Sequence, residues 1–314
     1  MIKAAVIGLG NMGQHHAKAY SALENVSFVA ACDSKIERFD HVIKSSNTKY
    51  YENMDDMLSN ETIDVVSICV PTMAHYDVAK KCIDAGIAVL VEKPIAETVA
   101  QAKDLVAYAK EKGCLLTVGH IERFNPAVLN VKKWIADGNL GRIQAITAKR
   151  YGPFPKQIKD ADVLVDVAVH DIDIVQFLVN EKPENTDIKT KQIHCDDRAD
   201  FGHLCMTFPG DVYVNIFVSW ALPYKERIIE IIGDKGIAVV DCIKQTVHVS
   251  KVDIEKGPDY VSLPIAETTQ LEFERREPII EECRAFVHAV ETKSKPAICP
   301  EQATEALSLA LLDR

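Results

Sequence analysis

Lys93 and Pro94 close an apolar run, "AVLVEKP", that has the composition of a buried strand. At an exposed strand end such a charge is ordinary, because lysine side chains lie mostly on protein surfaces. In an open parallel sheet, however, the carboxyl ends of the strands border the crevice where ligands bind. We therefore expect Lys93 to face a ligand. Pro94 disfavours helical geometry at Lys93 and brings a cis Lys93–Pro94 bond within about 0.5–1 kcal/mol of trans, so the turn can hold the lysine in one direction.

A second ionisable group lies in "DVLVDVAVHDIDIVQFL", where Asp166, His170 and Asp173 follow one another at spacings of four and three residues. On a helix this spacing places them on one face. The other positions are mostly apolar, so the helix should be buried and its ionisable face must be paired or must line a cavity. A histidine there is often a core residue, but a carboxylate four residues away can fix its tautomer for proton transfer. We expect His170 and Asp166 to serve chemistry and Asp173 to be a structural or substrate hydrogen-bonding partner. No third ligand has convincing spacing, so we expect no metal.

A glycine motif opens the chain: "VIGLGNMG" supplies Gly8, Gly10 and Gly13 in G-x-G-x-x-G spacing. Alone the motif is weak, but here it follows a strand pattern, opens a helical pattern and precedes Asp33 in "VAACD". Gly8 would allow the tight turn, Gly10 would let the backbone approach a pyrophosphate, and Gly13 would let helix and strand pack closely. The start of the helix, with Asn11 and Met12, should lie beside the diphosphate, because free N–H groups favour anionic oxygens.

Asp33 bears on which dinucleotide binds. Its carboxylate can accept hydrogen bonds from a ribose 2′-hydroxyl and would repel a 2′-phosphate, which favours NAD over NADP. The neighbouring Ser34, Lys35 and Arg38 keep NADP open.

The elements that must position these residues follow two patterns. Residues 1–121 alternate continuous apolar runs with helical patterns, which is typical of a parallel sheet covered on both faces. The expected strands are 3–10, 26–33, 63–71, 88–94 and 114–120, and the expected helices are 11–23, 35–45, 75–85 and 98–112. This predicts an α/β Rossmann domain with a doubly wound parallel sheet.

Residues 122–314 follow a different order. A helix near 125–136, a strand at 142–150, a loop "YGPFPKQIKDAD" and a helix near 165–179 precede consecutive strand-like runs from 186 to 250. Strands joined by short turns predict an α+β domain with a large, mostly antiparallel open sheet. Residues 255–268 read as an irregular excursion, and helices near 278–292 and 301–313 close the chain and could pack back on the first domain.

The totals exclude several kinds of partner. The chain of 314 residues has 36 Lys+Arg and 46 Asp+Glu, a net charge of −10, which argues against nucleic acid or an anionic membrane surface. A small-molecule partner is favoured. The nine cysteines include no C-x-x-C pair and mostly lie in apolar runs, which suits reduced thiols in the cytoplasm. No signal peptide or membrane-spanning run is recognisable.

The motifs together carry a family resemblance. The glycine motif, Asp33, "VPTMAH", "EKP", "GHIERFNPA" and "DVAVHDID" occur in the order seen in the glucose-fructose oxidoreductase and inositol dehydrogenase (Gfo/Idh/MocA) family, and the similarity spans almost the whole chain. The resemblance implies an E-K-P lysine in the active site and a D-x-x-x-H pair from the second domain. The strand ends also predict cofactor contacts from Pro71, Thr72, His75, Glu92 and Lys93.

The resemblance suggests a reaction: oxidation of a secondary hydroxyl on a sugar by hydride transfer to NAD. His170 is the expected general base, Lys93 would stabilise the developing alkoxide, and Asp166 would orient the pair, although Lys93 and His170 could exchange roles. The branch resembled is that of UDP-N-acetylglucosamine 3-dehydrogenases. An inositol or free-sugar dehydrogenase remains the near alternative, and a catalytically idle NAD-binding sensor is the alternative of another class.

Residues of the second domain are candidates for the sugar pocket, because cationic and polar groups can meet hydroxyls and a diphosphate. Ordinary pairing at the surface or between domains is the competing explanation. The candidates are Arg123, Asn125, Arg150, Tyr151 and Asp173. The open sheet, with "YVNIFVSW" on its uncovered face, also predicts a homodimer or homotetramer, as does the family resemblance.

Overall fold

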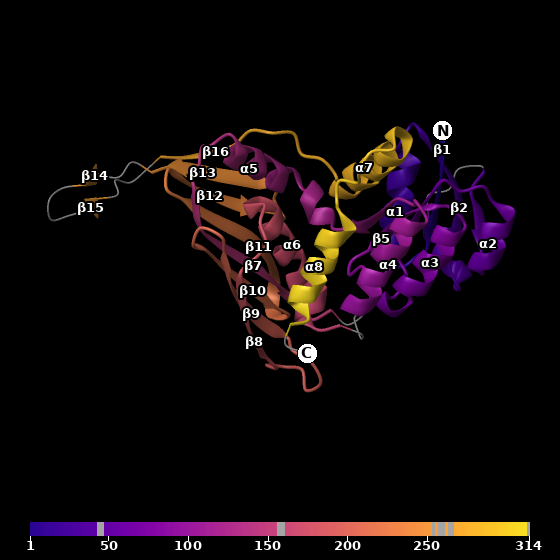
Figure 1. The fold of residues 1–314 in the computed structure, drawn as a ribbon, viewed down its shortest axis with the longest axis horizontal. Helices are drawn as coiled ribbons and strands as arrows, with labels where there is room; N and C mark the ends of the chain where they lie inside the picture. Colours follow the sequence, from indigo (N-terminus) through magenta and orange to yellow (C-terminus); the bar gives the residue numbers. More distant parts are fainter. Residues whose placement is uncertain (43–46, 156–160, 253–254, 257–260, 263–266, 313–314) are drawn as a thin grey trace. The chain divides into compact units, whose positions relative to one another are not determined.

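A computed structural model describes residues 1–42, 47–155, 161–252, 255–256, 261–262 and 267–312. The chain forms two compact units, each with its own sheet (Figure 1). Unit 1 comprises Met1–Ile121 and Glu277–Ser308, and unit 2 comprises Glu122–Arg276 and Leu309–Arg314. The helix that follows residue 277 and most of the last helix therefore belong to the first unit.

Unit 1 is the predicted doubly wound α/β domain. Its six strands all pair in parallel, in the order β3-β2-β1-β4-β5-β6. The strands are β1 (Ile2–Ile7), β2 (Val26–Cys32), β3 (Lys49–Tyr51), β4 (Val65–Ile68), β5 (Ala88–Glu92) and β6 (Leu116–Gly119). β4 and β5 are buried along their whole length, which explains their continuous apolar runs.

Helices flank this sheet, and α1 packs against α7 from the far end of the sequence. Tyr20, Phe28, Cys283 and Phe286 share one core cluster, so α7 completes the cover of the sheet beside α1. The helices are α1 (Asn11–Ala22), η1 (Ile36–His41), α2 (Met54–Asn60), η2 (Thr72–Ala74), α3 (His75–Asp84), α4 (Val99–Glu111), α7 (Pro278–Thr292) and α8 (Pro300–Ala310).

Two parts of unit 1 differ from the sequence prediction. The helix expected over 35–45 is a short 3-10 helix, η1, and residues 43–46 lie outside the described segments. Two short elements, β3 with three residues and α2 with seven, were not predicted from the sequence. Asn53 caps α2 by accepting a hydrogen bond from the Asp55 backbone N–H at 2.7 Å. A cap residue alone does not predict a helix when no hydrophobic periodicity follows it.

Unit 2 is the predicted α+β domain. Its main sheet has eight strands in the order β16-β13-β12-β11-β7-β10-β9-β8, and only β7 and β10 pair in parallel. The strands are β7 (Ile143–Pro153), β8 (Asn185–Lys191), β9 (Phe201–Phe208), β10 (Val212–Ser219), β11 (Ala221–Gly233), β12 (Gly236–Asp241), β13 (Thr246–Lys251), β14 (Glu255–Lys256), β15 (Val261–Ser262) and β16 (Thr268–Gln270). β14 and β15 form a separate pair within the predicted irregular excursion, most of which lies outside the described residues.

The described helices of unit 2 cover one face of this sheet (Figure 1). They are η3 (Ile121–Phe124), which starts at the unit boundary, α5 (Pro126–Ala136), the π-helical turn η4 (Leu164–Ala168) and α6 (Val169–Val179). α5 contacts β12 and β13, while α6 contacts β7 and β10. In "YVNIFVSW" the strand alternation sends Val214, Ile216 and Val218 toward the helices and leaves Tyr213 on the other face. The expectation that the whole run lines the uncovered face was therefore wrong, because successive side chains of a strand point to opposite faces.

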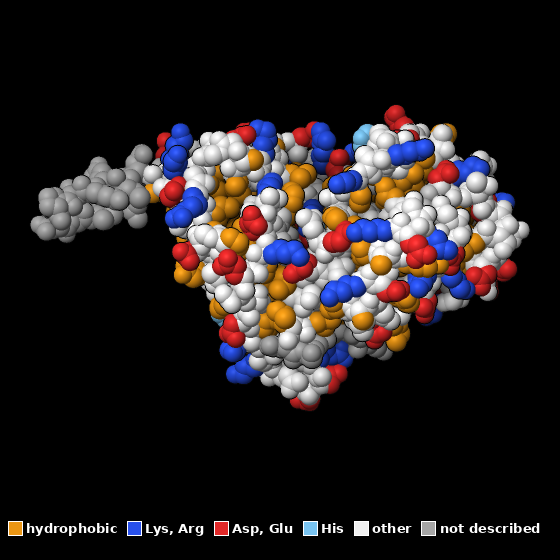
Figure 2. Space-filling model, viewed as in Figure 1, with side chains coloured by type: hydrophobic (Ala, Val, Ile, Leu, Met, Phe, Trp, Pro, Cys, Tyr) orange, Lys and Arg blue, Asp and Glu red, His pale blue; other side chains and the backbone are white. Residues whose placement is uncertain are grey.

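The described surface carries both signs of charge. On the face drawn in Figure 2, Lys and Arg side chains are interspersed with Asp and Glu over both units. Among the described helices, none has the length and apolar character needed to cross a bilayer.

Candidate active site

The carboxyl ends of β1, β2, β4 and β5 lie at one edge of the unit 1 sheet, because these strands are parallel neighbours. The chain winds outward from β1 in one direction to β3 and from β4 in the other direction to β6. Ligands of open α/β sheets bind at the carboxyl edge where the strand order reverses in this way. The glycine motif, Asp33, Pro71, Thr72 and Lys93 all follow these strand ends.

The glycine turn after β1 has the three properties that a dinucleotide site requires. Gly8 has φ +88°, and a Cβ there would lie 2.6 Å from the Cys69 carbonyl oxygen. A Cβ at Gly13 would lie 1.8 Å from the Gly8 carbonyl oxygen, so α1 packs directly on the turn. At Gly10, by contrast, a Cβ would meet no described atom within 4 Å. The turn is therefore closed behind Gly8 and Gly13 and open at Gly10, where the pyrophosphate would approach.

The start of α1 suits an anion. Gly10 is the N-cap residue and provides no side-chain cap, and the first turn of the helix contains no acidic residue. Unsatisfied N–H groups at a helix N-terminus bind phosphate through hydrogen bonds and the helix dipole. Asn11 is exposed and Met12 is half-buried at this end. The residues present thus fit a dinucleotide.

Asp33 lies at the end of β2 and is almost fully buried. Its Oδ2 accepts a hydrogen bond from the Leu9 backbone N–H at 2.6 Å, which ties the glycine turn to β2, and its Oδ1 accepts one from the Lys35 backbone N–H at 2.9 Å. Arg38 Nη1 also pairs with Oδ2 at 3.0 Å while its side chain stays 41% exposed. The carboxylate has further lone pairs for a ribose hydroxyl, and the guanidinium of Arg38 lies beside it.

Pro71, Thr72 and His75 follow β4. Pro71 is exposed and Thr72 half-buried, so both are accessible at the carboxyl edge. His75 begins α3 and is only 1% exposed. Its ring nitrogens lie 2.8 Å from the Pro94 carbonyl oxygen and 2.9 Å from the Val70 carbonyl oxygen. The structure thus places the His75 ring against two loops of the protein.

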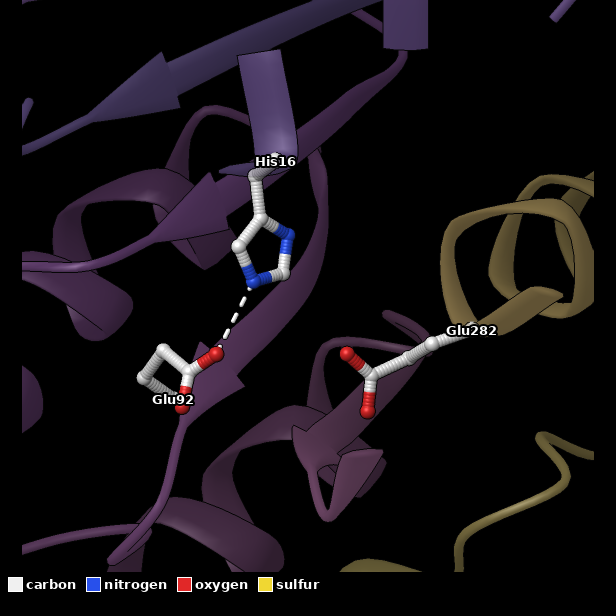
Figure 3. Close-up of side chains that lie close together, drawn as sticks. All are labelled: His16, Glu92 and Glu282. Carbon is white, nitrogen blue, oxygen red and sulfur yellow. Dashed lines mark hydrogen bonds and ion pairs between the residues drawn. The ribbon is translucent and has the colours of Figure 1, made fainter. Parts of the chain in front are cut away.

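Lys93 follows β5 and is half-buried, and the Lys93–Pro94 bond is cis, as the sequence predicted. The preceding Glu92 is buried and accepts a hydrogen bond from His16 Nε2 at 2.9 Å (Figure 3). Its other oxygen accepts the Lys93 backbone N–H at 3.2 Å. Burial opposes the negative charge, but the hydrogen bond from His16 and the charges of His16 and Lys93 outweigh it, so the pKa of Glu92 lies below its usual range.

His16 and Glu282 are neighbours of this site that were not predicted from the sequence. His16 comes from α1 and Glu282 from α7, and their ligand atoms and that of Glu92 all lie within 4.8 Å of one another (Figure 3). Cys283 Sγ lies 3.5 Å from His16 Nδ1. Burial and the nearby charge of Glu282 raise the pKa of Cys283 well above its usual value, so this thiol stays protonated. The 2.9 Å contact between His16 and the ionised Glu92 needs a hydrogen on Nε2, which occupies the lone pair that a metal would use.

In unit 2, Asp166 lies in the π-helical turn η4 and His170 in the first turn of α6. Both side chains are half-buried, unlike Asp171 and Asp173 next to them. Single π-helical turns within helices are frequent at functional sites, because they change the direction in which side chains leave the helix. Both side chains are therefore partly accessible, and their part in proton transfer stays a prediction.

Three of the proposed sugar-pocket residues form buried ion pairs within unit 2. Arg123 donates to Asp173 through Nε at 2.8 Å and Nη2 at 2.7 Å. Arg150 donates through Nε to Asp171 at 2.8 Å and through Nη1 to Glu122 at 2.8 Å. Each of these five side chains is at most 8% exposed. Such bidentate pairing inside the unit supports a structural role.

The electrostatics of this network differ between its two acids. Burial works against the charge of Glu122, but the guanidinium groups of Arg150 and Arg227 outweigh it and hold the pKa of Glu122 below its usual range. Burial dominates at Asp171 and raises its pKa in spite of Arg150.

The remaining two candidates for the sugar pocket differ in accessibility. Asn125 is 3% exposed, caps α5 through the Ala127 backbone N–H at 3.1 Å and donates to the Cys242 carbonyl oxygen at 2.9 Å. Tyr151 is half-buried on β7, and partial burial raises its pKa. Of the five candidates, Tyr151 is therefore the one whose polar atom is not placed in a buried pair or cap.

Comparison with known proteins agrees with this geometry. Residues 2–120 match the family described as "Oxidoreductase family, NAD-binding Rossmann fold", and residues 128–239 match the "GFO/IDH/MocA C-terminal domain". UDP-N-acetylglucosamine 3-dehydrogenase of Acidithiobacillus ferrooxidans is 27% identical over 300 residues, covering 95% of this chain and 91% of that protein. Inositol 2-dehydrogenase of Rhizobium meliloti is 25% identical over 98% of this chain and 94% of that protein.

A solved structure is similar along its whole length. That of the Acidithiobacillus ferrooxidans UDP-N-acetylglucosamine 3-dehydrogenase aligns with a TM-score of 0.87 and 25% identity, covering 99% of this chain and 96% of that one. With both family domains matched in sequence, and the parallel sheet and open sheet in place, the chain belongs to the Gfo/Idh/MocA family of oxidoreductases.

Proposed function

We propose that the protein oxidises a secondary hydroxyl of a sugar, with NAD as hydride acceptor. The observation that carries the proposal is the carboxyl edge of unit 1, where an open Gly10, a buried Asp33 and Lys93 follow neighbouring parallel strands. A glycine turn alone would serve any nucleotide-binding protein. The additional lysine at this edge supports a reaction beside the cofactor.

NAD is the proposed cofactor. Asp33 accepts hydrogen bonds from Leu9 and Lys35 and has lone pairs left for a ribose hydroxyl, whereas a 2′-phosphate would meet its negative charge. Arg38 partly offsets this preference, because its half-exposed guanidinium could turn from Asp33 to a phosphate. A comparison of the dissociation constants for NADH and NADPH tests the assignment, and tighter binding of NADPH would contradict it.

The protein's own groups carry the proton and the charge. His170 takes the hydroxyl proton, since an imidazole is matched to proton transfer near neutral pH. Lys93 donates a hydrogen bond to the substrate oxygen and stabilises the negative charge that develops there. Asp166 orients His170. The bound nicotinamide supplies the acceptor for the hydride that leaves the carbinol carbon.

The roles of Lys93 and His170 could also be exchanged, because a desolvated lysine can act as a base. Separate Lys93→Met and His170→Ala variants, followed by single-turnover reduction of NAD, test both roles. Each is expected to slow hydride transfer by about 100-fold or more, the range for loss of a general acid–base or charge-stabilising group. Near-normal hydride transfer in either variant would remove that residue from the mechanism. The double variant tests whether the two act on one substrate, because effects on a shared step are not additive.

The 3-hydroxyl of a UDP-N-acetylhexosamine is the proposed substrate group. Support comes from the 27% identity to a UDP-N-acetylglucosamine 3-dehydrogenase over 95% of the chain. An inositol substrate is the second candidate, supported by the 25% identity to an inositol 2-dehydrogenase. A panel of UDP-sugars, inositols and free sugars, assayed by NADH formation, separates the two. Binding of NAD without turnover of any member would instead favour the idle sensor.

A homodimer or homotetramer through the open sheet is also proposed. Strand register places Tyr213, Ala145, Ile232 and Ile237 in one row across β10, β7, β11 and β12, on the face away from the helices. The side chains of Tyr213, Ile232 and Ile237 are 58%, 46% and 36% exposed in the single chain. A row of exposed apolar side chains on a sheet is typical of a surface that a second subunit covers.

The cytoplasm is the proposed location. All nine cysteines fall in described segments and are free thiols. Free thiols persist in a reducing compartment.

A further inference from the structure

His75 makes two contacts that a neutral imidazole does not satisfy. Nδ1 lies 2.8 Å from the carbonyl oxygen of Pro94, and Nε2 lies 2.9 Å from the carbonyl oxygen of Val70. Both distances are those of good hydrogen bonds, and a carbonyl oxygen can only accept. In a neutral ring one nitrogen carries a lone pair, which would face the lone pairs of a carbonyl oxygen. Both contacts are satisfied together when both nitrogens carry a hydrogen.

The two carbonyl groups belong to the loops that follow neighbouring strands. Val70 lies just after β4, and Pro94 lies just after β5 and directly beyond Lys93. The ring is 1% exposed, so water does not compete for these hydrogen bonds. His75 thus joins the loop after β4 to the turn that carries Lys93.

Glu92 also binds the turn that carries Lys93. One oxygen accepts the Lys93 backbone N–H at 3.2 Å, and the other accepts His16 Nε2 at 2.9 Å (Figure 3). A Cβ at Gly119 of β6 would lie 3.0 Å from Glu92 Cδ, so the glycine at this position leaves room for the carboxylate. The backbone N–H of Lys93 is therefore bound to Glu92, and the carbonyl oxygen of Pro94 is bound to His75.

We propose that His75 is a buried imidazolium that positions Lys93 through its hydrogen bond to the Pro94 carbonyl oxygen. His16, His75 and Glu92 together hold the turn that carries Lys93. Glu92 is a nearby buried acid: burial would raise its pKa, but the hydrogen bond from His16 and the charges of His16, Lys93 and His75 lower it. A buried cation is tolerated where a carboxylate and hydrogen-bond acceptors surround it. His75 then acts on the reaction through Lys93, which is a different role from the cofactor contact expected from the sequence. The inference about Lys93 rests on the proposed function, whereas the protonation of His75 does not.

The protonation state is tested without substrate. The chain is labelled with ¹⁵N-histidine, and long-range ¹H–¹⁵N spectra are recorded at pH 7.5, where an unperturbed imidazole is mostly neutral. The His75 signal, assigned by its loss in the His75→Gln variant, is expected to show two protonated nitrogens. One protonated and one unprotonated nitrogen at His75 would overturn the imidazolium.

The positioning role is tested by kinetics. The imidazole can donate from two ring atoms, whereas a glutamine amide donates only from its nitrogen. A glutamine that donates to one carbonyl from the position of one ring nitrogen would turn its oxygen, which only accepts, toward the other carbonyl, so the turn should shift. We expect His75→Gln to lower the rate of hydride transfer by about 10- to 100-fold, the effect of a misplacement near 1 Å. The NADH dissociation constant should change by less than about threefold. The matched control His15→Gln, on the exposed face of α1, should leave the rate and the cofactor affinity unchanged.

A second variant separates positioning from other effects. In the Lys93→Met background, His75→Gln should reduce the rate by less than about twofold further, because a residue that acts through Lys93 has nothing left to position. A full additional loss, or weaker NADH binding at an unchanged rate, would overturn the positioning role. If wild-type protein oxidises no sugar, the proposed function fails, while the ¹⁵N spectra still decide the charge of His75.

Discussion

Two glycines of the turn after β1 should respond to the same substitution in opposite ways. Replacing Gly10 by alanine adds a methyl group that meets no described atom within 4 Å, whereas the same methyl group at Gly13 would lie 1.8 Å from the Gly8 carbonyl oxygen. Ordinary contact between such atoms is about 3.4–4 Å. The two variants therefore separate space reserved for a ligand from space used by packing.

The expected magnitudes follow from these distances. Gly10 has φ −65°, which alanine can adopt without strain. Alanine stabilises the protein by about 0.4–1 kcal/mol because it restricts the unfolded chain, but it is a poorer N-cap residue than glycine, so the two effects on the free energy of unfolding nearly cancel. The free energy of unfolding should stay within about 1 kcal/mol of wild type. At Gly13, α1 must move away from the turn by more than 1 Å, and overpacking of this kind costs about 1–3 kcal/mol or more.

The assay combines denaturant unfolding with NADH titration. Gly10→Ala should bind NADH at least about tenfold more weakly with unchanged stability, because the methyl group occupies the path of the pyrophosphate. Gly13→Ala should lose stability even without cofactor. Wild-type NADH affinity in Gly10→Ala, or wild-type stability in Gly13→Ala, would refute the account of the turn.

Four other predictions concern the cofactor, the buried ion pairs and the open sheet. Asp33→Asn should shift the ratio of NADH to NADPH affinity toward NADPH by about tenfold, and Arg38→Ala should shift it back; no shift on titration of both cofactors would show that Asp33 does not choose between them. Arg150→Met should lower the free energy of unfolding by about 3–5 kcal/mol, because Asp171 would remain buried without its cation and Glu122 would keep only Arg227. The pKa of Glu122 is lowered in the folded protein, so its stabilisation is present above the ordinary glutamate value and is lost as pH falls through the lowered value. Urea unfolding from pH 6 to pH 3 should show this loss in wild type and less of it in Glu122→Gln, while an equal slope would contradict the assignment. Ile232→Glu should dissociate the oligomer in sedimentation velocity, whereas Ile243→Glu, at an equally exposed isoleucine outside the row, should not; a wild-type monomer would exclude the proposed interface.

Much of unit 1 was predictable because its signals are local. The apolar strands, the glycine spacing and Asp33 all lie within short stretches whose geometry follows from backbone sterics and burial. The short β3 and α2 were missed because three and seven residues are too few to establish a period. The π-helical turn at Leu164–Ala168 was read as ordinary helix, since no residue pattern marks the change in winding.

The partners of the site residues could not be predicted, because they depend on tertiary contacts. His16 meets Glu92 across 76 positions of sequence, and Cys283 meets His16 across 267. The pairing of Arg123 with Asp173 joins two residues that the sequence had marked separately for a sugar pocket. Helical spacing predicted one face for Asp166, His170 and Asp173, but Asp166 lies in a π-helical turn and Asp173 is buried. The spacing also gave no means of finding Asp171 as the acid that binds Arg150.

Hydride transfer itself tests the central claim most directly. Enzyme in excess over UDP-N-acetylglucosamine is mixed with NAD in a stopped-flow instrument, and NADH absorbance is followed in wild type and in Lys93→Met. We predict a single-turnover rise of NADH in the wild type and a rise at least about 100-fold slower in the variant. If NAD binds to wild type and no UDP-sugar, inositol or free sugar produces NADH, or if Lys93→Met reacts at the wild-type rate, the proposed chemistry at the end of β5 is wrong.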